Sequence, residues 1–97
     1  MKIISSDETE FLGKWILQDG KPLADDVCAR IDFLINHYLE FKGRDVSGWD
    51  ILYRDPADGR YWELTYPDAN QHGGGAPALR VCSVEEAREK YPACTNR

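Results

Sequence analysis

Residues 49–79, WDILYRDPADGRYWELTYPDANQHGGGAPAL, decide the fold class of this 97-residue chain. Apolar residues recur at every second position on both sides of the loop DPADG: Trp49, Ile51 and Tyr53 before it, and Trp62, Leu64 and Tyr66 after it. Alternation with a period of two predicts β-strands over residues 49–54 and 60–66. Pro56 suits the second position of a turn, and Gly59 suits a left-handed one. The sequence therefore predicts an antiparallel β-hairpin.

The longest helical pattern precedes this hairpin. Asp25 or Asp26 can cap a helix, and its apolar face carries a set of residues at helical spacing: Val27, Ile31, Leu34, Ile35, Tyr38 and Leu39. We expect this helix to end near Lys42, with Gly43 just past its end. A strand over residues 13–18, closed by the turn pair Asp19-Gly20, comes before it.

The C-terminal third adds one strand and one short helix. Residues 78–82 alternate again, and Ser83 followed by Glu86 matches a capping box. The short helix should run to about Tyr91 and stop at Pro92. The order β-α-β-β-β-α over residues 1–97 predicts a single α+β domain, in which one long helix packs on a small, mainly antiparallel sheet, with a short C-terminal helix.

Charge and composition narrow the classes of partner. Twelve basic and seventeen acidic residues give a net charge of −5 and a pI near 4.9. Such a chain repels nucleic acid and anionic lipid and attracts basic proteins. Apolar runs of at most three residues predict no membrane span, and the polar start resembles no signal peptide, so we expect a cytoplasmic protein. Three scattered cysteines suggest reduced thiols, with no disulfide framework.

No motif in the chain completes a catalytic or cofactor site. The HGGG string of residues 72–75 resembles an oxyanion-hole loop, but the nucleophile motif G-x-S-x-G is absent from the sequence. The phosphate-binding glycine patterns are absent too, and no cysteine or histidine pair has zinc spacing. We therefore predict no cofactor and no metal.

The hairpin carries several carboxylates among its aromatic residues. Asp55 and Asp58 occupy turn positions, where aspartate caps the backbone. Glu63 lies in mid-strand and should face solvent or pair with an arginine such as Arg54. An acidic, aromatic hairpin suits a basic protein surface. Two other hypotheses stay open. One is a small hydrolase or ligand-binding protein built around the HGGG loop and the hairpin carboxylates, with Glu63 and His72 as the catalytic pair; the other is an adaptor subunit of a larger assembly.

The chain also resembles a known family, the immunity protein 27 family of bacterial polymorphic-toxin systems. The resemblance rests on segments spread over most of the sequence: residues 12–15 (LGKW), 24–28 (ADDVC), 30–35 (RIDFLI), 47–67 (SGWDILYRDPADGRYWELTYP), 72–79 (HGGGAPAL) and 83–87 (SVEEA).

This resemblance implies a non-enzymatic protein that binds and neutralises a cognate toxin domain, for example a basic nuclease. It implies no fixed set of binding residues. From charge and position, we expect the binding face of a free monomer to include five residues: Asp55, Asp58, Glu63, Asp68 and His72.

Overall fold

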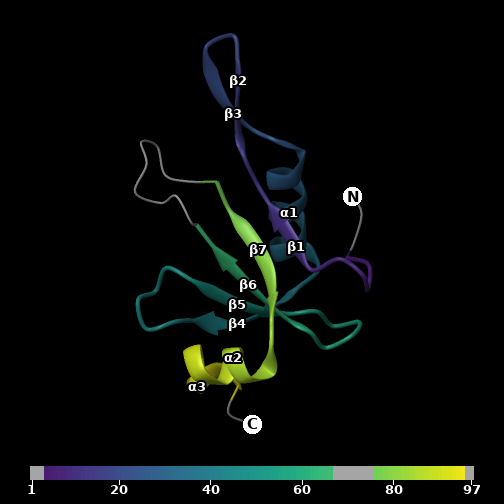
Figure 1. Ribbon diagram of the computed structural model, residues 1–97, viewed down its shortest axis with the longest axis vertical. Helices are drawn as coiled ribbons and strands as arrows, with labels where there is room; N and C mark the ends of the chain where they lie inside the picture. The colour runs from purple at the N-terminus through teal and green to yellow at the C-terminus, as the bar shows by residue number, and fades with distance from the viewer. Residues whose placement is uncertain (1–3, 67–75, 96–97) are drawn as a thin grey trace.

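The computed structural model describes residues 4–66 and 76–95 (Figure 1). Its elements are β1 (Glu10–Leu12), β2 (Trp15–Gln18), β3 (Lys21–Ala24), α1 (Asp26–His37), β4 (Glu40–Arg44), β5 (Ile51–Arg54), β6 (Tyr61–Thr65), β7 (Ala78–Cys82), α2 (Val84–Lys90) and α3 (Pro92–Thr95). Within the described residues, five strands form an antiparallel sheet in the order β1-β7-β6-β5-β4, and β2 pairs with β3 alone. The predicted α+β class, with one long helix on an antiparallel sheet, is confirmed.

The central hairpin forms as its sequence predicts. β5 pairs with β6 so that Tyr53 faces Trp62 across the strands. The connecting loop is closed by a hydrogen bond of 2.8 Å from the N–H of Asp55 to the carbonyl of Arg60. Gly59 has a φ of +80°, a left-handed conformation that glycine adopts without steric cost. Local turn chemistry and alternation were sufficient to predict this element.

Helix α1 begins where the sequence predicts but ends earlier. The carboxylate of Asp25 caps it by accepting from the N–H of Cys28 at 2.9 Å. The predicted end near Lys42 is wrong, because the helix stops at His37 and residues 40–44 form β4. Leu39 is buried in the core, and Phe41 pairs with Tyr53 of β5. Pairing with β5 therefore outweighs the helical spacing of these residues.

Three strands were missing from the predicted order. β4 replaces the end of the helix, β1 adds to the sheet beside β7, and β3 follows the turn at Asp19 and Gly20. These two residues have φ values of +54° and +75°, as in the tight turn of a two-residue hairpin. The predicted turn is therefore correct, but it connects two strands. This β2–β3 hairpin extends away from the sheet at the top of Figure 1.

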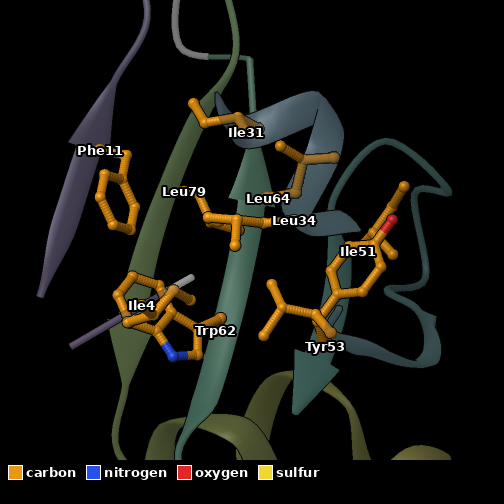
Figure 2. Close-up of a cluster of buried hydrophobic side chains, with 10 residues drawn as sticks. Ile4, Phe11, Ile31, Leu34, Ile51, Tyr53, Trp62, Leu64 and Leu79 are labelled. Atoms are coloured by element: carbon orange, nitrogen blue, oxygen red, sulfur yellow. The ribbon is translucent and has the colours of Figure 1, made fainter. Parts of the chain in front are cut away.

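The main core lies between α1 and one face of the sheet. Ile31 and Leu34 of α1 point toward Leu64 and Leu79, as Figure 2 shows. Trp62 is fully buried beside them, and its ring stacks on Phe11 of β1 at a centroid distance of 5.5 Å. Each such side chain contributes about 1.5–3 kcal/mol when it leaves water.

A second, smaller core occupies the other face of the sheet. Leu52 points away from the main core, because successive residues of a strand point to opposite faces, and it packs with Ala87 and Tyr91. The capping box at the start of α2 is confirmed, with Ser83 and Glu86 each accepting from the other's backbone N–H at 3.0 and 2.9 Å. α2 and α3 therefore cover this face (Figure 1).

The core predicts a clear contrast between two leucines. Leu34 is fully buried, whereas Leu12 on β1 is half exposed. Leu34→Ala should lower the free energy of unfolding by about 2–5 kcal/mol, because it removes packing and leaves a cavity. Leu12→Ala, the same chemical change at the surface, should cost about 0.5 kcal/mol. Urea unfolding measures both, and equal losses would contradict the assignment of the core.

Candidate functional site

Glu63 of β6 is a buried carboxylate held by two donors from the end of α2. The hydroxyl of Tyr91 donates to its Oε2 at 2.8 Å, and the ammonium of Lys90 lies 2.6 Å from the same oxygen. Only 9% of the Glu63 surface is exposed. A buried charge requires such partners, because desolvation without them costs several kcal/mol.

The expected environment of Glu63 was therefore wrong. The strand register places Glu63 opposite Leu52, and it places Arg54 opposite Tyr61. Arg54 instead lies 3.8 Å from the carboxylate of Glu40. Glu63 does not face solvent because α2 packs over that face of the sheet, and sequence alternation alone does not reveal this second layer.

Lys90 links Glu63 to the loop between β4 and β5. Its Nζ lies 2.7 Å from the carboxylate of Asp50 as well as close to Glu63. Desolvation acts to lower the pKa of Lys90, but the hydrogen bonds to these two carboxylates raise it above its ordinary value. Burial, followed by the hydrogen bond to Glu63, likewise raises the pKa of Tyr91. Both groups therefore keep their protons at neutral pH.

A pocket of about 290 Å³ lies over this network, and it is lined by Glu63, Cys82, Glu86, Glu89, Lys90 and Tyr91. Burial, with the charges of Glu63 and Glu86, raises the pKa of Cys82 to about 11. The thiol therefore stays protonated and is a poor nucleophile. Lys90 and Tyr91 are also protonated, so both can donate to Glu63 and hold α2 on the sheet.

Asp55 shapes the β5–β6 loop from within. It is 1% exposed, and its Oδ1 accepts from the Tyr38 hydroxyl at 2.7 Å and from the N–H of Ala57 at 2.8 Å. Burial, together with this contact to Asp55, raises the pKa of Tyr38 to about 12. Asp55 therefore fastens the loop to the end of α1 and presents little surface to a partner.

Asp58 is the more accessible of the two loop aspartates. Its side chain is 34% exposed and accepts from the backbone N–H of Arg60 at 3.0 Å and from Nε of that residue at 2.7 Å. The backbone hydrogen bond to Arg60 is the main cause that lowers the pKa of Asp58. Asp68 and His72, together with the HGGG string, lie outside the described residues.

A group of exposed side chains on β4 and the loop that follows it was not predicted from the sequence. Phe41, Val46 and Trp49 are 58%, 100% and 71% exposed, and the exposed cations Lys42 and Arg44 lie among them in the chain. We call these five residues the β4–β5 surface; the loop is the teal one at the left of Figure 1. Trp49 was expected to begin a strand over residues 49–54 and to share a face with Ile51 and Tyr53, but β5 begins at Ile51. The signal was Val46, an apolar residue inside the polar linker GRDVSG.

The β4–β5 loop is internally braced. Oδ1 of Asp45 accepts from the Ser47 hydroxyl at 2.7 Å and from the N–H of Gly48 at 3.0 Å. The N–H of Asp45 donates to the carbonyl of Asp50 at 3.0 Å, and Lys90 binds the side chain of Asp50. The hydrogen bond from Ser47 is the main cause that lowers the pKa of Asp45, so the bracing carboxylate is ionised at neutral pH. The loop is therefore ordered before any partner arrives.

Two kinds of feature are absent from the part of the chain that the structure describes. There, no three His, Cys, Asp or Glu side chains are placed to hold a metal ion together. Likewise, none of the helices over residues 4–66 and 76–95 has the length and apolar character needed to cross a membrane.

The Glu63 network predicts how stability changes on loss of one hydroxyl. Tyr91→Phe should lower the free energy of unfolding by about 1–3 kcal/mol at pH 7, because the buried carboxylate loses a donor. The native pKa of Tyr91 is raised above 10.0. Its contribution is therefore complete below pH 10 and declines above it, where the unfolded state releases the proton first.

Urea unfolding at several pH values measures this difference, and Tyr66→Phe, at a tyrosine that is 38% exposed, is the matched control. A Tyr91→Phe protein as stable as the wild type at pH 7 would contradict the assigned role of this hydroxyl.

The chain matches a known protein family. The sequence model described as immunity protein 27 matches residues 17–83, about two thirds of the chain. No curated protein and no solved structure matches the chain. The matched region includes α1, the β4–β5 surface, the central hairpin and β7. The chain belongs to the immunity protein 27 family.

Proposed function

We propose that this protein is an immunity protein that neutralises a cognate bacterial toxin domain by one-to-one binding in the cytoplasm of the producing cell. Membership of the immunity protein 27 family is the observation that carries this proposal. Such proteins are encoded beside a secreted or contact-delivered toxin. The net charge of −5 adds physical support, because it attracts toxin domains that are basic, such as nucleases.

The state of the titratable groups favours binding over catalysis. A catalytic acid or base is tuned to exchange its proton near neutral pH. The raised pKa values of Cys82, Lys90 and Tyr91 instead hold these groups in one protonation state. Glu63, the proposed partner of His72 in a hydrolase, is already bonded to Lys90 and Tyr91. No contact of the described residues favours the hydrolase hypothesis.

The direct test is protection from the neighbouring toxin. Expression of the C-terminal domain of the toxin encoded beside this chain should stop growth, and co-expression of the chain should restore it. The purified pair should form a one-to-one complex by size-exclusion chromatography with light scattering. A protein of the same family from another toxin locus is the control. Continued growth arrest with both proteins present at equal amounts would contradict the proposal.

Salt dependence tests the electrostatic part separately. If the net charge of −5 steers a basic toxin domain, the association rate constant should fall about tenfold when ionic strength rises from about 0.01 M to about 0.15 M, as the Debye length shortens. Stopped-flow fluorescence measures this rate. A rate constant that does not change with salt would contradict electrostatic steering, but it would not contradict neutralisation of the toxin.

A further inference from the structure

The β4–β5 surface has the properties of a preformed contact site. Val46 is fully exposed and Trp49 is 71% exposed, although most large apolar side chains of the described residues are buried or half-buried. The ring of Phe41 packs edge-on against Tyr53 at 6.0 Å, and the Arg44 guanidinium lies 6.0 Å from the ring centre of Phe41. Exposed aromatic and arginine side chains are typical of the residues that dominate binding energy at protein interfaces.

The loop that carries Val46 and Trp49 is already ordered. The Asp45 carboxylate and the Asp50–Lys90 ion pair fix its backbone, as described above. A rigid loop loses little conformational freedom on binding, so more of the contact energy appears as affinity. The conformational entropy of the loop is therefore already lost on folding, before Val46 and Trp49 contact a partner.

The charge of this surface differs from that of the whole chain. Lys42 and Arg44 are exposed and have no ion pair among the described residues. The nearest acidic side chains in sequence are engaged elsewhere: Glu40 with Arg54, Asp45 in the loop and Asp50 with Lys90. Two positive charges are thus open to a partner, and one of them, on Arg44, lies beside the exposed ring of Phe41.

A second copy of the chain is a poor fit to this surface. β4 is an edge strand of the described sheet, and its pairing with β5 shifts register between Phe41 and Gly43. A bulge and an outward lysine on an edge strand both oppose edge-to-edge pairing. Two copies of this surface would bring like charges at Lys42 and Arg44 together. The charge instead fits a partner that supplies carboxylates.

We propose that the β4–β5 surface is the docking surface for the toxin domain, and that it fits an apolar recess bordered by carboxylates. Trp49 enters the recess, while Lys42 and Arg44 pair with the acidic border. This proposal rests on the proposed immunity function. It agrees with a toxin that is basic overall, because net charge governs the approach of two proteins and local charge governs their contact.

The test measures binding of the neighbouring toxin domain to full-length variants by isothermal titration calorimetry. Trp49→Ala should weaken binding by about 30-fold or more, as expected for a central aromatic residue. Val46→Asp, at a fully exposed position that the fold does not use, should weaken it by about tenfold, since it places a negative charge against the acidic border. Lys42→Glu and Arg44→Glu should each weaken it by about tenfold.

Matched controls make the same changes elsewhere. Leu12→Ala removes an exposed apolar side chain from β1, and Arg88→Glu reverses an exposed charge on α2. Asp58→Asn compares this surface with the binding face expected from the sequence, which included Asp58 in the β5–β6 loop. That loop lies at the right of Figure 1, at the opposite end of β5 from the β4–β5 loop. Leu12→Ala and Arg88→Glu should bind as the wild type does, and circular dichroism should show every variant folded.

Each result that differs from these expectations contradicts a specific part of the proposal. If the wild type does not bind the toxin domain, the immunity function and this docking surface both fall. If the wild type binds and Trp49→Ala and Val46→Asp bind equally well, only the docking surface falls, and a loss in Asp58→Asn would move the contact to the β5–β6 loop. If Lys42→Glu and Arg44→Glu bind as the wild type does while the other two variants lose affinity, the partner has no acidic border at this surface. A wild-type dimer that Trp49→Ala dissociates would make this surface a self-interface.

Discussion

Strand β6 is buried on both of its faces, and this burial links the two layers of the fold. Trp62 and Leu64 point into the main core under α1, and Glu63 between them points to the other face. A carboxylate there is tolerated only with donors, which the end of α2 supplies through Lys90 and Tyr91. Because Lys90 also binds the β4–β5 loop, one buried charge joins the sheet, the C-terminal helix and the loop that carries the exposed aromatic residue.

This arrangement separates the acidic residues into two groups with different roles. Asp55, Glu63 and Asp45 accept several hydrogen bonds each and stabilise the loops and layers of the fold. Carboxylates that remain at the surface, such as those of Glu85 and Glu89 on α2, contribute the net charge that acts at long range. The overall charge of the chain therefore says little about the charge of the surface that makes contact.

Local sequence signals predicted the elements that depend on neighbouring residues. The turn at Gly59 and the capping box at Ser83 formed as predicted, and the cap is Asp25, one of the two candidates, because each feature needs only residues within four positions. The strand over residues 40–44 and the burial of Glu63 depend on pairing and packing between distant segments. Helical spacing is the same whether Leu39 reaches the core from a helix or from a strand, so the sequence left this choice undetermined. The exposure of Trp49 was missed because the alternating pattern extends to residue 49, whereas β5 begins at Ile51.

Hydrogen exchange with mass spectrometry, on the free protein and on its complex with the toxin domain, tests whether a rigid sheet presents the β4–β5 surface to the partner. The account predicts slow exchange in β5, β6 and β7 in both states, and new protection on binding at residues 41–49. New protection confined to α1 or to the β5–β6 loop, with residues 41–49 unchanged, would contradict it.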